Sequence, residues 1–253
     1  MMEAAHVRPE GWGVCPWFTL GPLAVPAYSV LMFFAFAAGF AVCRHNARKS
    51  GAKTGQIFPV VLAALFGGVL GAKLPAWVVA LSTVPMAGWS LGLFLSGRTI
   101  VGGFVGAMLG VWWVKRRLGI TGRFGNVLVP GVALGLAVGR IGCFLSGCCY
   151  GRPCGCGWGV DFGDGIARHP TQLYEALFFL FAFVVVQHRM PVARPGSLMS
   201  GFLSAYFVFR FFGEFLRPGD GGLLTMFQWI CLAGLLLIGV RAWFRGKGAR
   251  DAE

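Results

Sequence analysis

Acidic residues are scarce in this chain of 253 residues, and none occurs between positions 11 and 160. Charged residues of both signs make up only 12% of the sequence, whereas hydrophobic residues make up 57%, and the mean hydropathy is +0.71. This composition excludes an ordinary soluble domain and predicts an integral membrane protein. The first eighteen residues also lack the basic start and short apolar core of a cleaved signal peptide, so we expect the N-terminus to stay on the mature protein.

Long apolar segments replace the missing charge. A helix that crosses a bilayer needs about 20 apolar residues, and the sequence offers seven such segments within what we expect to be a single transmembrane domain over 1–253. The prediction is an all-α membrane protein with about seven transmembrane helices. These are expected near 21–43, 56–81, 98–114, 124–145, 170–188, 197–216 and 222–243. Between the second and third, Pro85 and several glycines indicate a loop or a re-entrant segment shielded by protein.

Basic residues are divided unequally between the two sides of this arrangement. Fourteen of the 22 lie in alternate connections and the C-terminal tail, and five lie in the opposite connections. Because cytoplasmic loops carry an excess of Lys and Arg, this bias predicts a periplasmic N-terminus and a cytoplasmic C-terminus. A basic face beside anionic lipid accounts for most of the net charge of +13, so no nucleic-acid partner is expected.

Three basic residues remain inside the apolar segments, namely Lys73, Arg140 and Arg210. A basic side chain at the centre of a bilayer costs about 2.5–3.5 kcal/mol, so such residues usually face a polar cavity with a partner or a ligand. A rise of about 1.5 Å per residue places all three in the outer half of the membrane. We therefore predict one polar pocket on that side.

Two carboxylates are expected near this pocket. Glu175 falls in the first turns of a span that enters from outside, and Glu214 follows Arg210 by one helical turn. A structural ion pair would explain Arg210 and Glu214 without any ligand. Arg140 has no such neighbour in sequence, and an excess of guanidinium groups over carboxylates suits an anion. At that depth, the abundant anion is a phospholipid phosphate.

Two further patterns support lipid binding to different degrees. In RHPTQLYEA (168–176), Pro170 suits the first turn of a helix whose free N–H groups and positive dipole would attract phosphate. Gln172 and Tyr174 would add hydrogen bonds at headgroup level. The glycine-rich stretches 99–110 and 130–139 would admit a lipid chain close to the backbone, although ordinary helix packing through small residues explains most of these glycines.

Five motifs, spread over residues 20–243, resemble those of the prolipoprotein diacylglyceryl transferase family. They are PAYSVLMFF (26–34), TIVGGFVGA (99–107), GRIGCFLSGCCYG (139–151), RHPTQLYEA (168–176) and RFFGEFLRPGD (210–220). The resemblance implies a seven-span enzyme of the bacterial inner membrane with its site toward the periplasm. Such an enzyme moves the diacylglyceryl group of phosphatidylglycerol to the lipobox cysteine of a prolipoprotein, forms a thioether and releases glycerol phosphate. No cofactor is implied.

The resemblance also assigns residues. The catalytic arginines of the family correspond to Arg140 and Arg210, which would stabilise the departing phosphate, and Glu214 would orient Arg210. A larger group is expected to bind substrate. It comprises Tyr28, Lys73, Gly102, Gly103, Cys143, Gly151, His169, Gln172, Tyr174, Glu175, Tyr206 and Arg217.

The chain departs from the family pattern at three positions. Val101 replaces a histidine, Cys143 replaces an asparagine and Cys148 replaces a carboxylate. A valine cannot act as a base for the incoming thiol, so either another group does so or the thiol arrives ionised. The candidate bases are Glu175, His169, Tyr28 and a thiolate of Cys148 or Cys149.

Four cysteines lie in the Cys/Gly-rich loop 147–169, which we expect to be periplasmic: Cys148, Cys149, Cys154 and Cys156. An oxidising compartment permits disulfides, and four cysteines allow three pairings between which the sequence does not choose. A structural disulfide is the first expectation, and a redox-active or acceptor thiol is the second. A metal site comes last, since the spacing is not the usual CxxC pair, and none is predicted.

Three other functions remain open. A paralogous transferase with a different acceptor would explain the three departures. A lipid transporter or flippase could use the same charged pocket, but transporters often carry inverted repeats, which are not evident here. A catalytically dead binding or scaffold protein would have little use for buried charges that are costly to keep in a membrane.

Overall fold

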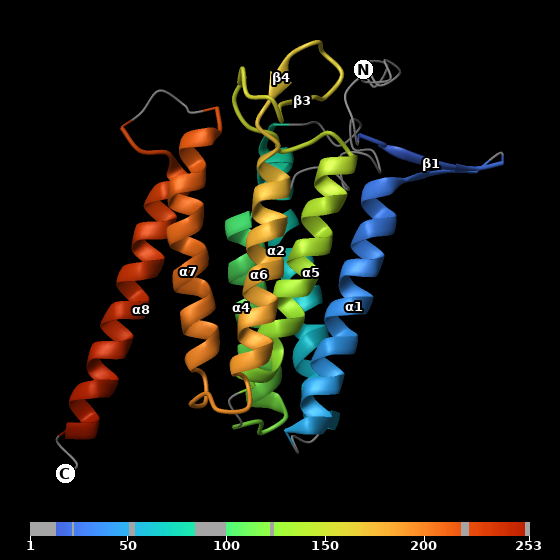
Figure 1. Ribbon diagram of the computed structural model, residues 1–253. Helices are drawn as coiled ribbons and strands as arrows, with labels where there is room; N and C mark the ends of the chain where they lie inside the picture. The colour runs from blue at the N-terminus through green and yellow to red at the C-terminus, as the bar shows by residue number, and fades with distance from the viewer. Residues whose placement is uncertain are drawn as a thin grey trace. The chain divides into compact units, whose positions relative to one another are not determined.

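The computed structural model describes residues 14–21, 23–50, 54–83, 100–121, 124–218 and 223–250. This part of the chain is mostly helical, as predicted (Figure 1). Its helices are α1 (Ala27–Lys49), α2 (Thr54–Thr83), α4 (Ile100–Arg117), α5 (Gly125–Leu145), α6 (Thr171–Arg189), α7 (Ser197–Gly213) and α8 (Met226–Arg250). A short 3-10 helix, η2 (Glu214–Leu216), follows α7 directly.

Short strands form two antiparallel hairpins beside the helices. The first pairs β1 (Trp17–Leu20) with β2 (Leu23–Pro26), and the second pairs β3 (Val160–Asp161) with β4 (Ala167–Arg168). The second hairpin lies in the loop between α5 and α6, for which the sequence allowed no prediction of secondary structure.

The chain divides into two compact units. Unit 1 contains residues 1–43 and 125–253, and unit 2 contains residues 44–124. In unit 1, the core lies between α5, α6 and α7, where Val129 and Ala133 of α5 pack with Phe179 of α6 and Phe202 of α7. Tyr206 of α7 packs against the same core, with its ring 5.2 Å from that of Phe179.

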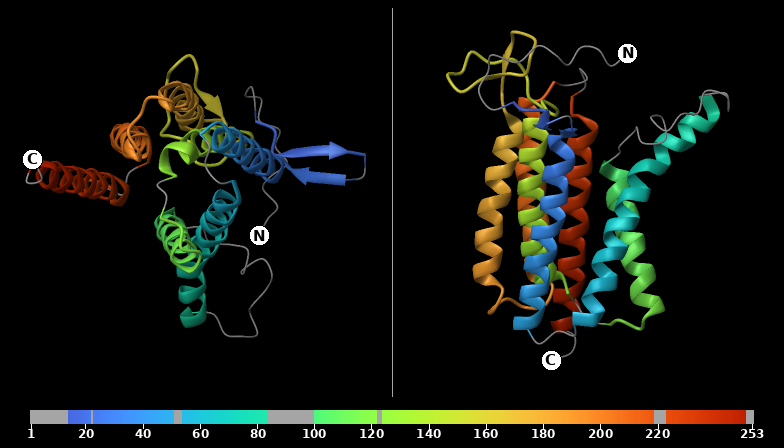
Figure 2. Two further views of the ribbon diagram at one scale, coloured as in Figure 1. Left: turned by 90° about the horizontal axis from the view of Figure 1, so that it is seen from below. Right: turned by 90° about the vertical axis from the view of Figure 1, so that its right-hand side faces the viewer.

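Helix α1 packs on α5 at glycines, so the two backbones approach closely (Figure 2). A Cβ atom on Gly131 would clash with the carbonyl oxygen of Gly39 and with the Cys43 sulfur. Farther along, a Cβ atom on Gly142 would lie 2.9 Å from Cβ of Leu31. The packing role expected of the glycines in 130–139 is therefore confirmed for Gly131.

Unit 2 is built on the pairing of α2 with α4, and here too glycines form the contact. A Cβ atom on Gly67 or Gly71 of α2 would overlap the carbonyl oxygen of Gly106 or Gly102 of α4. A Cβ atom on Gly103 would lie 3.3 Å from the backbone oxygen of Gly68. The stretch 99–110 thus supplies a glycine surface on which α2 packs.

Five helices of the described residues are long and apolar enough to cross a membrane. They comprise α1, residues 55–74 of α2, α5, α6 and residues 226–244 of α8. Every α-helix of the described chain also carries exposed large apolar side chains, such as Phe33 of α1, Met108 of α4 and Leu236 of α8. Apolar surface of this extent suits contact with lipid rather than water. The protein is a helical membrane protein, and the count of seven spans stays a prediction.

Each predicted span overlaps a helix, and the largest differences in bounds are at α1 (Ala27–Lys49, predicted 21–43) and α8 (Met226–Arg250, predicted 222–243). Helix α1 begins at Ala27 rather than at 21, because residues 17–26 form a hairpin around Gly21, which has φ +63°. The Ala27 N–H donates to the carbonyl oxygen of Pro16 at 2.9 Å and so ties the helix start to this hairpin. Helix α8 begins at Met226, four residues later than predicted. The segment around Pro85 lies outside the described residues.

Candidate active site

Four segments of unit 1 meet at one end of the helices. These are the C-terminal end of α5, the N-terminal end of α6, the 3-10 helix after α7 and the start of α8 (Figure 1). The loop between α5 and α6, with its β3–β4 hairpin, lies at the same end. Polar and charged side chains of these segments make up the candidate site.

Glu175 of α6 connects two arginines from different segments. Nη2 of Arg140 lies 2.6 Å from Oε2 of Glu175, and Nη2 of Arg217 donates to Oε1 of Glu175 at 2.7 Å. The Glu175 side chain is only 4% exposed, whereas the two arginine side chains keep 18% and 17%. A single buried carboxylate therefore positions two partly accessible guanidinium groups.

Arg210 and Glu214 form a second ion pair across one turn, and both side chains are buried. Thr225, at the start of α8, donates its hydroxyl proton to Oε1 of Glu214 at 3.2 Å. The guanidinium carbon of Arg210 lies 5.3 Å from the ring centre of Phe227, a distance that suits a cation–π contact. The structural ion pair considered from sequence is thus present, and helix α8 supports it.

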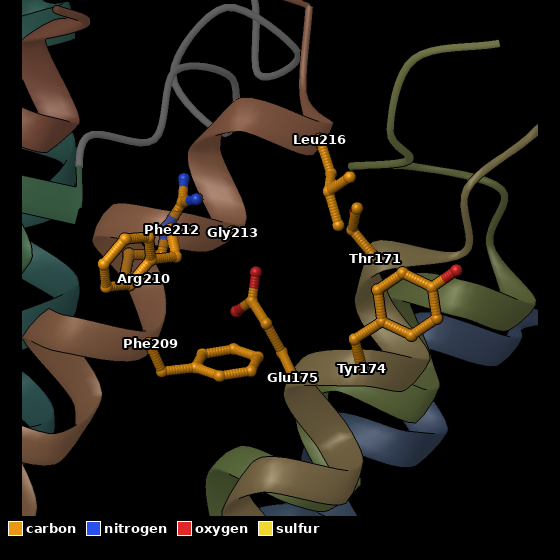
Figure 3. Close-up of a pocket in the computed structure, with 8 residues that line it drawn as sticks. All are labelled: Thr171, Tyr174, Glu175, Phe209, Arg210, Phe212, Gly213 and Leu216. Carbon is orange, nitrogen blue, oxygen red and sulfur yellow. The ribbon is translucent and has the colours of Figure 1, made fainter. Parts of the chain in front are cut away.

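A cavity of about 400 Å³ opens beside these charges (Figure 3). Glu175 and Arg210 both line it, and Figure 3 shows the Glu175 carboxylate projecting into the space between α6 and α7. Its remaining wall comprises Thr171, Tyr174, Phe209, Phe212, Gly213 and Leu216. The cavity therefore joins an apolar wall to a charged end.

The charges at this end do not balance. Three guanidinium groups, on Arg140, Arg210 and Arg217, accompany the carboxylates of Glu175 and Glu214. One positive charge is left over among the described residues of this network. A partly buried site with such an excess favours an anionic ligand, as the sequence predicted for the pocket.

The predicted headgroup ligand Gln172 is fully buried and holds the preceding loop. Its Nε2 donates to the Cys148 carbonyl oxygen at 2.6 Å, and the adjacent Thr171 hydroxyl donates to the Cys149 carbonyl oxygen at 2.9 Å. Both bonds tie the residues after Arg140 to the first turn of α6. In this structure, Gln172 acts on the loop, and a direct contact with lipid stays a prediction.

Gly151 lies where three segments cross. A Cβ atom at this position would lie 2.8 Å from Cβ of His169 and 2.5 Å from the Leu216 carbonyl oxygen. The Gly151 N–H donates to the His169 carbonyl oxygen at 2.8 Å, and the Arg152 N–H donates to that of Leu216 at the same distance. Only glycine fits this crossing, which sets the spacing of the loop from Arg217.

His169 and Tyr174 form a polar group near the cavity. Nδ1 of His169 lies 3.2 Å from the Tyr174 hydroxyl, which also accepts a hydrogen bond from Nε1 of Trp158 at 2.9 Å. The Cys156 sulfur lies 3.9 Å from the same histidine nitrogen. Since Tyr174 lines the cavity, this group is placed to meet a polar headgroup.

The loop cysteines behave in two ways. Cys154 and Cys156 form a disulfide, a pairing that the sequence did not select. Cys148 and Cys149 are free thiols. Hydrogen bonds with the Cys143 and Cys148 thiols lower the pKa of Cys149, and nearby Arg140 lowers it further, whereas hydrogen bonding within the same group raises the pKa of Cys148.

Two predicted tyrosines also belong to unit 1. Tyr206 lies near enough to Arg140 for their charges to interact. The Tyr28 ring lies beside Gly142, one turn from the loop. Lys73, Gly102 and Gly103 belong instead to unit 2, where Lys73 lines a groove between α2 and α4 of about 750 Å³, so their place in the site stays a prediction.

The sequence analysis missed Thr225, although a signal was present. The Thr225 N–H donates to Oε1 of Gln228, and the Gln228 N–H donates to the Thr225 hydroxyl, at 2.9 and 3.3 Å. This is a capping box, whose T-x-x-Q pattern is visible in TMFQ (225–228). Reading it would have placed the start of α8 at Met226, whereas the contact of Thr225 with Glu214 is visible only in the structure.

Comparison with known proteins shows the family of the chain. Residues 16–244 match the family described as prolipoprotein diacylglyceryl transferase. A phosphatidylglycerol–prolipoprotein diacylglyceryl transferase of Oleidesulfovibrio alaskensis is 34% identical over 88% of this chain and 91% of its own length. Proteins of the same name from Clostridium tetani and Bordetella parapertussis are 30% and 34% identical over 87% and 88% of this chain, and over 93% and 94% of their own lengths. The chain belongs to the prolipoprotein diacylglyceryl transferase family.

Proposed function

We propose that this protein transfers the diacylglyceryl group of phosphatidylglycerol to the lipobox cysteine of prolipoproteins. The observation that carries the proposal is the group of three guanidiniums on two buried carboxylates beside a cavity with an apolar wall. Relatives of this chain are named for this reaction. The substrates are phosphatidylglycerol and the signal peptide of a prolipoprotein, within membrane lipid, and the proposal involves no nucleic acid.

The reaction is a substitution at carbon. The acceptor sulfur forms a bond to the terminal glyceryl carbon, and the bond from that carbon to the phosphate oxygen breaks. The electron pair of this bond leaves with glycerol phosphate, and the thiol proton passes to a base or to water. Negative charge grows on the departing phosphate, where guanidinium groups held in place beforehand are most effective.

Each arginine has a part in this scheme. Arg140 and Arg217 are paired with Glu175, and their side chains are partly exposed, so they can contact the phosphate. Arg210, which lines the cavity, contributes the third positive charge, and Glu214 orients it. The aromatic wall, which includes Phe209 and Phe212, receives the start of an acyl chain.

We place the site on the periplasmic side of the bacterial inner membrane. Helices α4 and α7, which are 18 and 17 residues long, complete seven spans in a single transmembrane domain. Arg116 lies 4.8 Å from the ring centre of Trp112 at the C-terminal end of α4, a pairing typical of a membrane interface. Basic residues end α1 and α6, and by the positive-inside rule we assign these helix ends to the cytoplasm and the loop 147–169 to the periplasm.

The test is transfer of labelled diacylglycerol from phosphatidylglycerol to a lipobox peptide by the purified protein. Arg140→Ala and Arg210→Ala should each lower the rate by about 10²–10³. Arg189→Ala is the matched control, because Arg189 is exposed at the far end of α6. Equal activity of all variants would contradict the proposed roles.

A related acceptor is the second candidate. The substitutions at Cys143 and Cys148 lie beside Arg140, where an acceptor would have to approach. If the protein binds phosphatidylglycerol but leaves the lipobox peptide unmodified, a paralogous transferase with another acceptor becomes the better assignment.

A further inference from the structure

Three free thiols converge beside the arginines of the site. The sulfur atoms of Cys143, Cys148 and Cys149 all lie within 4.8 Å of one another. Two of these positions, Cys143 at the end of α5 and Cys148 in the loop that follows, are among the three at which the chain departs from the family pattern. The two departures are 5 residues apart in sequence but meet at one point in space.

The backbone holds this group in place. The Cys148 N–H donates to the Cys143 carbonyl oxygen at 3.1 Å, and α6 binds the carbonyl oxygens of Cys148 and Cys149 through Gln172 and Thr171. Cys149 has φ 65°, and no other non-glycine residue in the described ranges has a positive φ. A left-handed conformation of this kind persists only where the surroundings impose it, and it often marks a functional position.

Three cysteine sulfurs at these separations suit a zinc ion. Thiolate sulfur prefers soft or borderline metals, and zinc binds it at about 2.3 Å, which puts tetrahedral ligands about 3.8 Å apart. The separations of up to 4.8 Å need little adjustment to reach this value. Arg140 and Arg217 lie close enough to Cys149 to offset the negative charge of a zinc trithiolate. Cys154, Cys156 and His169 also lie together, but the disulfide removes two of their thiolates.

We propose that Cys143, Cys148 and Cys149 bind a zinc ion whose fourth position receives the acceptor thiol. This inference rests on the proposed function. Catalytic zinc sites keep three protein ligands and one open position, and a thiol that coordinates zinc loses its proton. Valine at position 101, where the family has a histidine, cannot accept the proton of the acceptor thiol. Zinc would ionise this thiol instead.

The step balances without an oxidant or reductant. The acceptor thiol coordinates zinc and releases one proton to water. Its sulfur then bonds to the glyceryl carbon as the bond from carbon to phosphate oxygen breaks, and glycerol phosphate leaves beside Arg140. The thioether product is a weak ligand and departs from zinc, which reopens the fourth position.

Metal binding can be measured independently of transfer. The purified full-length protein, with its Cys154–Cys156 disulfide kept intact, is treated with a chelator and then loaded with Zn²⁺, and its metal content is determined. Titration with Co²⁺ reports the same site, because thiolate ligation gives a charge-transfer absorption band. Cys143→Ser, Cys148→Ser and Cys149→Ser are compared with Cys15→Ser, which changes an exposed free cysteine outside the group.

We expect about one Zn²⁺ per chain and a cobalt–thiolate band, both retained by Cys15→Ser. Each of the other three substitutions should weaken metal binding by more than about tenfold. A lipobox peptide should change the cobalt spectrum, whereas the same peptide with Ser in place of its Cys should not. Binding that survives removal of all three thiols would overturn the site.

Transfer then separates this inference from the one on which it rests. Activity lost with the chelator and restored by Zn²⁺ supports both. An undiminished rate in the metal-free protein would overturn the zinc inference and leave the proposed function intact. If zinc binds but neither form transfers lipid, the proposed function fails and the acceptor role of the zinc falls with it.

Discussion

The two buried carboxylates of the site hold their arginines in different ways. Glu214 pairs with Arg210 one turn away on the same helix and receives a hydrogen bond from Thr225. Glu175 instead bridges Arg140 and Arg217, which come from different segments, the latter 42 residues along the chain. The local pair can be read from sequence, whereas the bridge exists only once α5, α6 and η2 have packed. The positions of Arg140 and Arg217 therefore depend on helix packing through Glu175. Four substitutions test the difference between this bridge and the local pair of Arg210 and Glu214.

Glu175→Gln should have the largest effect. Its neutral amide would leave Arg140 and Arg217 without a charged partner, and removal of one partner from a buried ion pair typically costs about 3–5 kcal/mol. We also expect the transfer rate to fall by about 10²–10³, because both guanidiniums lose their position. Transfer kinetics and thermal unfolding in detergent measure the two effects. A rate within twofold of that of Arg189→Ala would show that the bridge is dispensable.

Glu214→Gln should be less harmful, because only Arg210 loses a charged partner. Both side chains of this pair are buried, so we expect a loss of stability near the lower end of about 3–5 kcal/mol. The rate should fall by about tenfold, less than the 10²–10³ of a removed donor, because Arg210 keeps its charge. The same two measurements apply. The comparison would be reversed if this substitution slowed transfer more than Glu175→Gln does.

Arg217→Lys keeps the charge but removes the planar fork of the guanidinium group. A lysine can reach Glu175 or a phosphate oxygen but cannot bind both in a fixed geometry, so we expect a several-fold rise in KM for phosphatidylglycerol and little change in kcat. Arg152→Lys, at an exposed position in the loop between α5 and α6, is the control. An equal rise in both variants would remove the special role of Arg217.

Thr225→Val should have the smallest effect. It removes the hydroxyl that bonds to Glu214 and caps α8, which is worth about 1 kcal/mol, and we expect transfer to stay within about twofold. Thr225→Ser, which keeps the hydroxyl, should unfold at nearly the wild-type temperature. A large fall in transfer with Thr225→Val alone would show that Thr225 contacts substrate.

Much of the helical framework could be predicted, because about 20 consecutive apolar residues leave few alternatives in a membrane. Helix α5 spans 125–145, close to the predicted 124–145, and α6 spans 171–189, close to the predicted 170–188. The start of α1 was missed, because the hairpin at 17–26 is apolar as well and differs from a helix only in its hydrogen bonds.

The sequence by itself determined the membrane class of the protein, its charged side chains within apolar segments and the local pair of Arg210 and Glu214. These follow from composition and from the spacing of one helical turn. Only the tertiary structure decided that Glu175 joins Arg140 to Arg217. It also decided that three thiols converge beside the arginines. Contacts between distant segments depend on how helices and loops pack, and neither spacing nor residue type along the chain encodes that geometry.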